Sequence, residues 1–329
     1  MKNYVIVLLL IASIVSCKKE STGNSKIIGN VFGTSYSVIY HADKQLDLES
    51  QFDSIFHVIN RSMSTYQTNS IISKLNRNEK VVLDNHFIKV FDASKTIHKL
   101  TKGVFDPTIG VLVNAWDFGP EGEVKDLDSI KIKELMGSVD FNKVMRFENK
   151  LIKYDMNTFL DFNAIAKGYA VDVIAQFLEE NNIDNYLVEI GGEITGKGIN
   201  LDKQLPWKIG VENPSFDGTQ SIFKAISLRD AAMATSGTYR KFKVDKEGNR
   251  YAHIIDTKTG YPSKTNLLSV SVITNDCMTA DAYATAFKAM GIENVKHFLQ
   301  LHPELKAFLI FENEENVLET LSLNGFPEN

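Results

Sequence analysis

The amino-acid sequence predicts an α+β fold formed by one compact domain. Two short runs of β-branched and aromatic residues, YSVIYH at 36–41 and YLVEI at 186–190, indicate strands. Two longer stretches, 48–66 and 164–182, carry apolar residues at helical spacing and indicate helices. No internal repeat or Pro/Gly-rich linker follows the N-terminal segment, so we expect one domain of about 300 residues with a core that needs no disulfides.

The N-terminal segment has the pattern of a lipoprotein signal peptide. One lysine precedes an apolar run, Tyr4 to Val15, that is too short for a comfortable membrane span. Ser16 and Cys17 then resemble a bacterial lipobox, in which cleavage leaves the cysteine as the lipidated first residue. We expect a signal peptide (1–16), a lipidated tether (17–26) and one domain (27–329), anchored in the cell envelope through Cys17 and facing the periplasm or exterior. A soluble secreted protein with a chance cysteine is the alternative.

The charge argues against nucleic-acid binding, and the cysteine content argues against a disulfide. Removal of the signal peptide takes away one of 36 basic residues, so 35 face 41 acidic residues and the net charge becomes −6. Such a chain does not attract nucleic acid by its overall charge. Cys277 has no partner once Cys17 is acylated, so we expect no disulfide and a small buried apolar side chain.

The segment before and within the 164–182 helix is typical of a phosphate site. Asp161 precedes the helix, Asn163 is expected to cap it, and Lys167 is expected in its second turn. A helix start offers free N–H groups and a positive dipole end, and a lysine adds a point charge. A capping aspartate and a solvated lysine explain the same residues without a ligand.

Two further segments leave a functional and a structural interpretation open. The glycines of EIGGEITGKG permit close approach of a ligand to the backbone, and a tight β-turn explains them equally well. His253 lies in a segment dense with polar side chains, yet a lone histidine is often structural. The segment also contains Asp256, Thr257, Lys258 and Thr259.

The stretch CMTADAYATAFKAMG, residues 277–291, predicts a helix that ends at a glycine. It places Asp281 and Thr285 one turn apart, so that a carboxylate and a hydroxyl share one face. With a backbone carbonyl from elsewhere, these oxygens would suit Mg²⁺, which prefers oxygen ligands and keeps positions for substrate phosphates. An aspartate favoured by the helix dipole and a filler threonine explain the pair equally well.

The order and spelling of eight segments resemble the ApbE-type FAD:protein FMN transferases, which move FMN from FAD onto a protein hydroxyl. The resemblance runs from about Gly29 to Gly291 and implies a single α+β domain of the flavin-transferase, T-fold-like type. It rests on FGTSY, MSTYQTNSIISKLN, GVFDPTIGVLVNAW, DFNAIAKGYAVD, YLVEIGGEI, ATSGTYRKF, HIIDTKTGYP and TADAYATA.

The resemblance also implies roles for individual residues. Asp161 and Lys167 would contact FAD, and the Ala164 carbonyl, Asp281 and Thr285 would hold Mg²⁺. Tyr66 would stack on the flavin, and Phe32, which stands where the family often has methionine, would belong to the same site. Val104, Phe105 and Asp106 would line the same cleft. His253 and Ile255 would lie near the nucleotide.

These assignments predict a magnesium-dependent transfer of FMN from FAD to a Thr or Ser hydroxyl, with release of AMP. The acceptor would be an electron-transport subunit with a motif similar to D-G/A-x-S/T-G/A-A-T. His253 is the first candidate for the general base, and Asp256 is the second. An FAD pyrophosphatase that gives FMN and AMP, and a non-enzymatic flavin-binding lipoprotein, are the alternatives. The presence of both Asp281 and Thr285 argues against the last.

Overall fold

The computed structural model describes residues 23–42, 46–239, 242–244, 248 and 250–328, so the expected signal peptide and Cys17 lie outside the described residues. It confirms the predicted α+β fold. The centre is an eight-stranded sheet in the order β1-β2-β5-β6-β9-β12-β13-β14, and neighbouring strands in it are antiparallel. Its strands are β1 (Ser25–Val31), β2 (Thr34–Tyr40), β5 (Tyr186–Ile190), β6 (Glu193–Lys197), β9 (Ala231–Gly237), β12 (Leu267–Thr274), β13 (Lys306–Glu312) and β14 (Leu318–Leu323).

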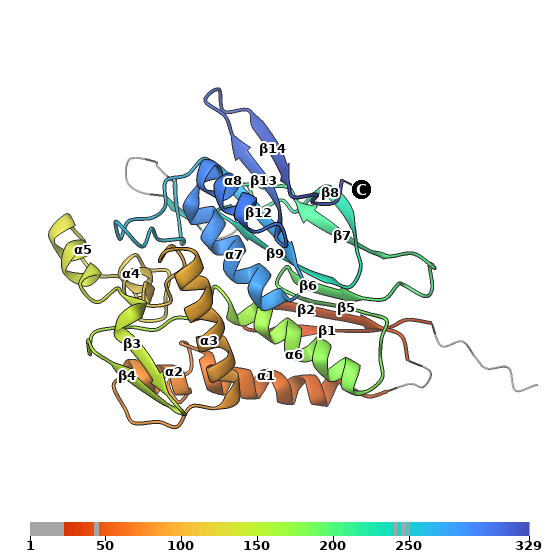
Figure 1. Cartoon of the computed structure of the whole chain (residues 1–329), viewed down its shortest axis with the longest axis horizontal. Helices are drawn as coiled ribbons and strands as arrows, with labels where there is room; N and C mark the ends of the chain where they lie inside the picture. The colour runs from red at the N-terminus through yellow and green to blue at the C-terminus, as the bar shows by residue number, and fades with distance from the viewer. Residues whose placement is uncertain (1–22, 43–45, 240–241, 245–247, 249, 329) are drawn as a thin grey trace, which may run out of the picture.

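Helices α6 (Ala166–Glu180) and α7 (Cys277–Met290) pack on one face of this sheet and enclose the main core (Figure 1). They approach each other closely because Gly168 has no side chain: a Cβ there would lie 2.3 Å from the carbonyl oxygen of Cys277. Helix α1 (Glu49–Met63) packs beside α6, and α8 (Ile292–Leu301) follows α7. The pairing of α6 with α7 brings the two predicted site segments together.

A hairpin of β7 (Trp207–Glu212) and β8 (Ile222–Leu228) covers part of the opposite face. Its inward side chains, Ile209 and Ile226 among them, join Met233 and Ile273 of the sheet in a second, smaller core. The sheet therefore has different layers on its two faces, with helices on one and a hairpin on the other.

A lobe of short elements extends from the helical side. It contains α2 (Ile71–Asn76), α3 (Asn85–Leu100), α4 (Gly110–Ala115), α5 (Ser129–Met136), the 3₁₀ turn η1 (Phe141–Lys143) and the ribbon of β3 (Val144–Phe147) and β4 (Lys150–Lys153). The small hairpin of β10 (Phe242–Val244) and β11 (Arg250–Ala252) precedes the His253 segment.

The predicted elements are present with small shifts at their ends. The strands expected at 36–41 and 186–190 are β2 and β5, and the helices expected at 48–66, 164–182 and 277–291 are α1, α6 and α7. Cys277 is buried and makes no disulfide. The first strand begins at Ser25, within the range expected for the tether. None of the described helices is long and apolar enough to cross a bilayer.

Two local details of the α6 segment were predicted wrongly. Asn163 does not cap the helix, because its backbone N–H donates to Asp161 Oδ1 (2.7 Å) in a turn, and Ile165 occupies the N-cap position without a side-chain bond. Since the helix starts at Ala166, Lys167 is its second residue and lies in the first turn rather than the second. The lysine is therefore closer to the positive end of the helix dipole than expected.

Candidate functional site

The N-terminus of α7 is clamped by two carboxylates. Asp172 on α6 accepts the backbone N–H groups of Cys277 and Met278, each at 2.8 Å, and Asp276 caps the helix by accepting from Thr279 N–H. Burial raises the pKa of Asp172 to about 7, against the effect of the two N–H donors. These bonds fix the position and rotation of α7 relative to α6.

The clamp places Asp281 and Thr285 in the interior between α7, α6 and β9. Asp281 is 4% exposed, and its Oδ2 accepts the Gly168 N–H at 3.0 Å. Thr285 Oγ1 lies 3.0 Å from the Ser236 hydroxyl on β9. Burial raises the pKa of Asp281, while the Lys167 ammonium and the Gly168 N–H act in the opposite direction.

The bond from Gly168 to Asp281 joins the start of α6 to α7. Gly168 is the third residue of α6, so its N–H is one of the groups at a helix start that have no acceptor within the helix. Asp281 supplies that acceptor, and no described backbone N–H donates to the Ala164 carbonyl just before the helix. The predicted ligand Ala164 therefore directly precedes α6, and Asp281 and Thr285 lie on α7, which this bond holds against α6.

Glu193 is a site residue that the sequence interpretation missed. It is the first residue of β6, and its Oε1 lies 2.6 Å from Lys167 Nζ. Glu193 is 3% exposed, and no described group donates a hydrogen bond to its Oε2. Burial raises its pKa, the Lys167 charge lowers it, and the Asp281 charge raises it further. Lys167, Glu193 and Asp281 therefore form one electrostatic cluster.

A signal for Glu193 was present in EIGGEI, which was considered only for its glycines. Gly191 and Gly192, with φ of 62° and 98°, form the two-residue turn between β5 and β6, so the tight-turn interpretation is confirmed. This turn delivers Glu193 to the start of α6. An acidic residue directly after a glycine turn beside a predicted phosphate site was the available clue.

The chemistry of this cluster fits a divalent cation. Two buried carboxylates, Asp281 and Glu193, share a single lysine, and one carboxylate oxygen has no described hydrogen-bond donor. Excess buried negative charge of this kind is stabilised by a cation. The described residues contain no group of three or more His, Cys, Asp or Glu side chains arranged to hold a metal ion. A cation here would therefore depend on hydroxyl, carbonyl and substrate oxygens, which is the preference of Mg²⁺.

Several residues predicted to bind the flavin are connected to the segment that enters α6. The Asp161 N–H donates to the Pro107 carbonyl at 2.8 Å, which joins the α6 entry segment to the loop that contains Val104. Tyr66 follows α1, is 60% exposed, and has its pKa raised by partial burial and then by the Asp161 charge. Phe32, at the β1–β2 turn, packs edge to face on Phe56 with ring centroids 5.7 Å apart.

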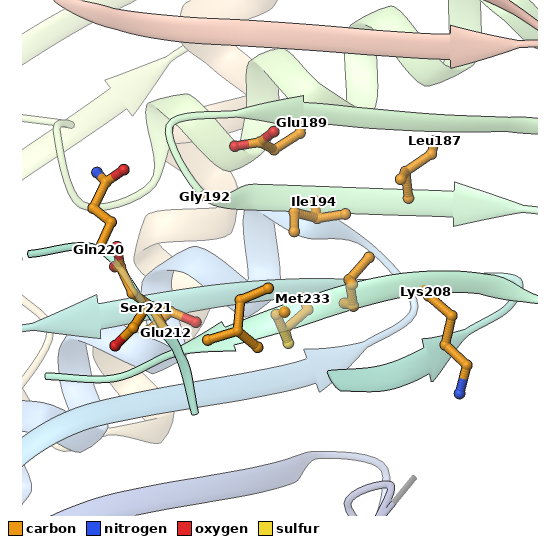
Figure 2. Close-up of a pocket in the computed structure, with 13 residues that line it drawn as sticks. Leu187, Glu189, Gly192, Ile194, Lys208, Glu212, Gln220, Ser221 and Met233 are labelled. Atoms are coloured by element: carbon orange, nitrogen blue, oxygen red, sulfur yellow. The ribbon is translucent and has the colours of Figure 1, made fainter. Parts of the chain in front are cut away.

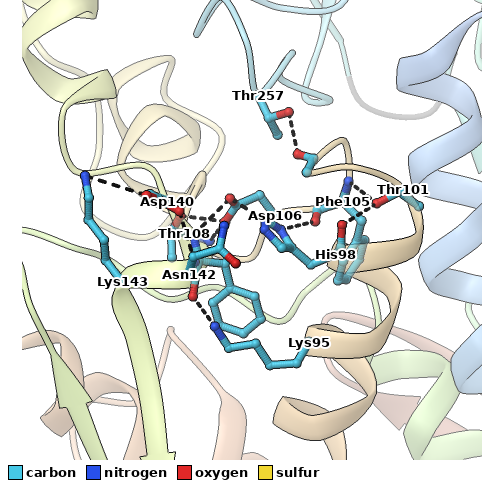
Figure 3. A network of polar contacts seen from close by, with 12 residues as sticks. Lys95, His98, Thr101, Phe105, Asp106, Thr108, Asp140, Asn142, Lys143 and Thr257 are labelled. Atoms are coloured by element: carbon cyan, nitrogen blue, oxygen red, sulfur yellow. Dashed lines mark hydrogen bonds and ion pairs between the residues drawn. The ribbon is translucent and has the colours of Figure 1, made fainter.

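The predicted cleft residues Phe105 and Asp106 are turned into the protein, and Figure 3 shows the network around them. Asp106 Oδ1 accepts the Thr108 N–H (2.8 Å) and hydroxyl (2.5 Å), and its Oδ2 accepts the Phe141 N–H (3.1 Å). The Phe105 carbonyl lies 2.9 Å from Nδ1 of His98. These two residues shape the loop from within, whereas Val104 is partly exposed.

The His253 segment is bonded to the same lobe. Thr257 Oγ1 donates to the Gly103 carbonyl at 2.8 Å (Figure 3). Ile255 is buried with Leu112, which leaves its backbone as the part able to meet a nucleotide. Asp256 Oδ1 accepts the Lys258 N–H at 2.7 Å and so stabilises a turn.

Both candidates for the general base, His253 and Asp256, are partly exposed. The His253 ring meets Phe118 edge to face at 6.2 Å between centroids, and the Asp256 carboxylate accepts a bond within its own turn.

A cavity of about 420 Å³ lies on the other face of the sheet, beneath the β7–β8 hairpin (Figure 2). Its lining includes Met233 and Thr235 of β9, whose side chains alternate with that of Ser236, the neighbour of Thr285. None of the predicted site residues lines it. Gly192, which lines the cavity, directly precedes Glu193. The candidate site residues described above lie on the helical face of the sheet.

Together, the fold and this site define a single-domain α+β protein with a buried acidic cluster at the start of a lysine-bearing helix. A model of the ApbE family matches residues 32–309. The chain belongs to the ApbE family, which confirms the resemblance seen in the sequence.

Two curated relatives, both named FAD:protein FMN transferase, cover most of the chain. The Vibrio cholerae protein is 34% identical over 302 residues, which cover 89% of each chain. The Haemophilus influenzae protein is 34% identical over 338 residues, which cover 98% of this chain and 96% of the relative. These relatives are named as enzymes, and the chain matches them over nearly their full length.

Solved structures show the same fold. The flavin transferase ApbE from Vibrio cholerae matches with a TM-score of 0.81 at 32% identity, over 91% of this chain and 96% of that chain. The ApbE protein from Thermotoga maritima matches with a TM-score of 0.79 at 27% identity, over 93% and 99% of the two chains.

Proposed function

We propose that this protein transfers FMN from FAD to a Thr or Ser hydroxyl of an acceptor protein, with Mg²⁺ as cofactor and AMP as the leaving product. The observation that carries the proposal is the cluster of the buried carboxylates Asp281 and Glu193 with Lys167 at the start of α6. The names of the relatives support the choice of FAD as donor and of a protein as acceptor.

The start of α6 suits the FAD pyrophosphate. The positive end of the helix dipole favours phosphate oxygens, and Lys167 in the first turn adds a full charge. The Tyr66 side of the site would receive the isoalloxazine ring by stacking, and the His253 segment would lie along the nucleotide.

Asp281, Thr285 and the Ala164 carbonyl would hold Mg²⁺, which when bound neutralises pyrophosphate charge and makes AMP a better leaving group. Glu193 keeps Lys167 directed at the cluster. The acceptor hydroxyl oxygen forms a bond to the flavin-side phosphorus, and the bond from that phosphorus to the AMP oxygen breaks. His253 would take the hydroxyl proton.

We further propose that the protein acts at a membrane, held by lipid on Cys17, on an acceptor from an electron-transport system. The apolar run before Cys17 and the polar tether after it support the anchor. The acceptor would carry a motif similar to D-G/A-x-S/T-G/A-A-T. An enzyme tethered to the membrane would meet membrane-bound subunits at a high effective concentration.

Protein-bound fluorescence tests the proposal. The mature chain is incubated with FAD, MgCl₂ and a candidate electron-transport subunit that carries the motif, and the proteins are then denatured and separated. We expect flavin fluorescence on the acceptor, dependent on Mg²⁺, with one AMP released per label. FMN and AMP without labelled protein would show a pyrophosphatase instead, and FAD binding without turnover would show a flavin-binding protein.

A further inference from the structure

The ribbon of β3 and β4 presents apolar side chains on its outer face. Met145 lies opposite Ile152 in the strand register, and the Tyr154 hydroxyl donates to Met145 Sδ at 3.4 Å. Phe147 follows Met145 on the same face by strand alternation. We call these four side chains the ribbon face. They are 50%, 51%, 69% and 67% exposed in the order named.

The opposite side of the ribbon is held firmly against the lobe. Val144 is fully buried, and Arg146 makes two bonds to Asp92 on α3, at 3.0 and 2.6 Å. The Asn149 carbonyl at the hairpin turn accepts the Leu83 N–H at 2.9 Å. The ribbon face is therefore a fixed surface, and no described residue covers it.

We infer that the ribbon face is the docking surface for the protein that accepts FMN, an inference that rests on the proposed function. Contiguous exposed apolar side chains on a soluble protein mark interaction sites. Methionine and aromatic residues are enriched in protein–protein interfaces. Two aromatic rings, an isoleucine and a methionine on a rigid ribbon therefore have the composition of an interface centre.

The position of the ribbon relative to the site indicates the acceptor as the occupant. The chain runs from Lys153, the last residue of β4, to Asp161, eight residues that span at most about 28 Å. This segment is bonded to the end of α2 by a reciprocal pair between Asn76 and Leu160 (2.9 and 2.8 Å), and just beyond α2 Asn78 Nδ2 donates to the Met156 carbonyl (3.0 Å). Helix α2 follows Tyr66 closely, so a protein on the ribbon face would stand beside the flavin side of the site.

Charged side chains surround the ribbon face as a polar rim. The exposed Lys150 lies opposite Phe147 in the strand register, and Lys143 lies 3.8 Å from Asp140. An apolar centre with a polar rim is the arrangement of a protein–protein interface.

The N-terminal end of the described chain lies away from the ribbon face. Asn24 is bonded to Asp202 and Asn200, and Figure 1 shows the start of β1 at the end of the long axis opposite β3 and β4. Cys17 is seven residues earlier, at most about 24 Å of extended chain away. A lipid on Cys17 would hold that end near the membrane and leave the ribbon face to a protein.

Direct binding and turnover are measured with the mature chain and two variants. The test variant is F147S/I152S, and the matched control is Ile28→Ser, because Ile28 on β1 is as exposed as Phe147, at 67%. The probe is the soluble domain of a motif-bearing electron-transport subunit, with a seven-residue peptide of the motif for comparison. We expect F147S/I152S to bind the domain at least ten-fold more weakly without FAD present, and to raise its KM similarly.

The same variant is expected to keep the FAD affinity, the kcat and the KM for the peptide within two-fold, since the ribbon face lies outside the chemistry. The Ile28→Ser variant should match the wild type throughout. Phe147→Asp serves as a second variant if the double variant unfolds at a lower temperature.

Each contrary result has one meaning. Wild-type binding and transfer in F147S/I152S would overturn the docking inference and leave the proposed function intact. If the wild type binds the domain, F147S/I152S binds it more weakly, and the wild type transfers no FMN, the proposed function is wrong and the docking inference stands. If F147S/I152S binds the domain as the wild type does but no longer binds phosphatidylethanolamine–phosphatidylglycerol vesicles that the wild type binds, the occupant is a membrane. If it binds the domain normally but loses a dimer that the wild type forms, the occupant is a second copy. Either result would overturn the inference.

Discussion

Lys167 Nζ and Glu193 Oε1 lie 2.6 Å apart, one on the first turn of α6 and the other at the start of β6. The carboxylate is almost fully buried, whereas the lysine side chain is one-third exposed. The lysine therefore reaches from the surface into the cluster and holds its charge toward the buried carboxylates. An incoming pyrophosphate meets an ammonium that is already oriented, which reduces the entropy lost on binding.

Separate and joint removal of this pair tests its role. Lys167→Met should weaken FAD binding at least about ten-fold, because a phosphate loses its charged partner. It should also lower the free energy of unfolding by about 2 kcal/mol, less than for a fully buried pair because Lys167 is partly exposed. Adding Glu193→Gln should restore most of the stability and none of the FAD affinity. Additive effects in the double-mutant cycle, from calorimetry and urea unfolding, would contradict a coupled pair.

Asp281→Ala should abolish turnover and leave the fold intact. The substitution removes the only carboxylate among the three proposed metal ligands, so we expect kcat to fall at least about 100-fold. Stability should not fall, because burial disfavours the ionised form of this carboxylate. Glu314→Ala, at an exposed carboxylate between β13 and β14, is the control. Full activity of Asp281→Ala, or of the wild type in EDTA, would exclude the magnesium assignment.

Local pattern was enough to predict α6 and α7, because their apolar spacing matches the faces that they bury. It failed at Asn163, where Asp161 accepts the N–H that begins the turn. The inward orientation of Asp106 depends on Phe141, which is 35 residues away, and such long-range bonds cannot be read from spacing.

The site was predicted in part for the same reason. Asp281 and Lys167 were candidates from their helix positions, and the resemblance added their roles, whereas Glu193 was overlooked because the glycines before it explained its segment. Apolar strand residues such as Phe147 are usually interpreted as core, so the exposed ribbon face could not be recognised before the fold was known.

Lys288 gives a pH-dependent prediction for stability. It is fully buried on α7, its Nζ donates to Thr265 Oγ1 at 2.8 Å, and burial lowers its pKa from 10.5 to about 8. Between pH 8 and pH 10.5 the unfolded chain binds more protons at this amine than the folded chain, so stability should rise with pH in that window. The full gain is about 3 kcal/mol, and it is absent below pH 8.

Urea unfolding between pH 7.5 and pH 10 checks this expectation. Lys288→Met should be more stable than the wild type at pH 7.5 and should lose the rise, because it buries no charge. Lys89→Met, at an exposed lysine on α3, should keep the wild-type profile. A stability of the wild type that falls across the window would contradict the lowered pKa.

Cys17→Ser should release the protein from the membrane fraction. The proposed acyl chains on this single cysteine are its only proposed anchor, and lipid anchors contribute about 0.8 kcal/mol for each buried CH₂ group. Fractionation of cells that express the wild type and the variant measures the effect. A variant that still sediments with membranes after a high-salt wash would rule out the lipobox interpretation.

The final prediction is that the protein labels other chains and not itself. Its sequence contains two near matches to the acceptor motif, DGTQSIF from Asp217 and DAAMATS from Asp230. Gln220 and Met233 stand at the position of the acceptor hydroxyl, and neither side chain has an oxygen nucleophile for phosphorus. Met233 is also 1% exposed within β9, so its segment cannot enter the site without unfolding the sheet.

Intact-mass spectrometry after incubation with FAD and Mg²⁺ decides this point. We expect an unchanged mass for this chain, flavin that is lost on denaturation, and an added FMN mass only on a second, motif-bearing protein. That protein with its acceptor threonine replaced by valine is the control, and it should remain unlabelled because valine offers no hydroxyl. A stoichiometric FMN addition to this chain would show that it modifies itself and would contradict the prediction.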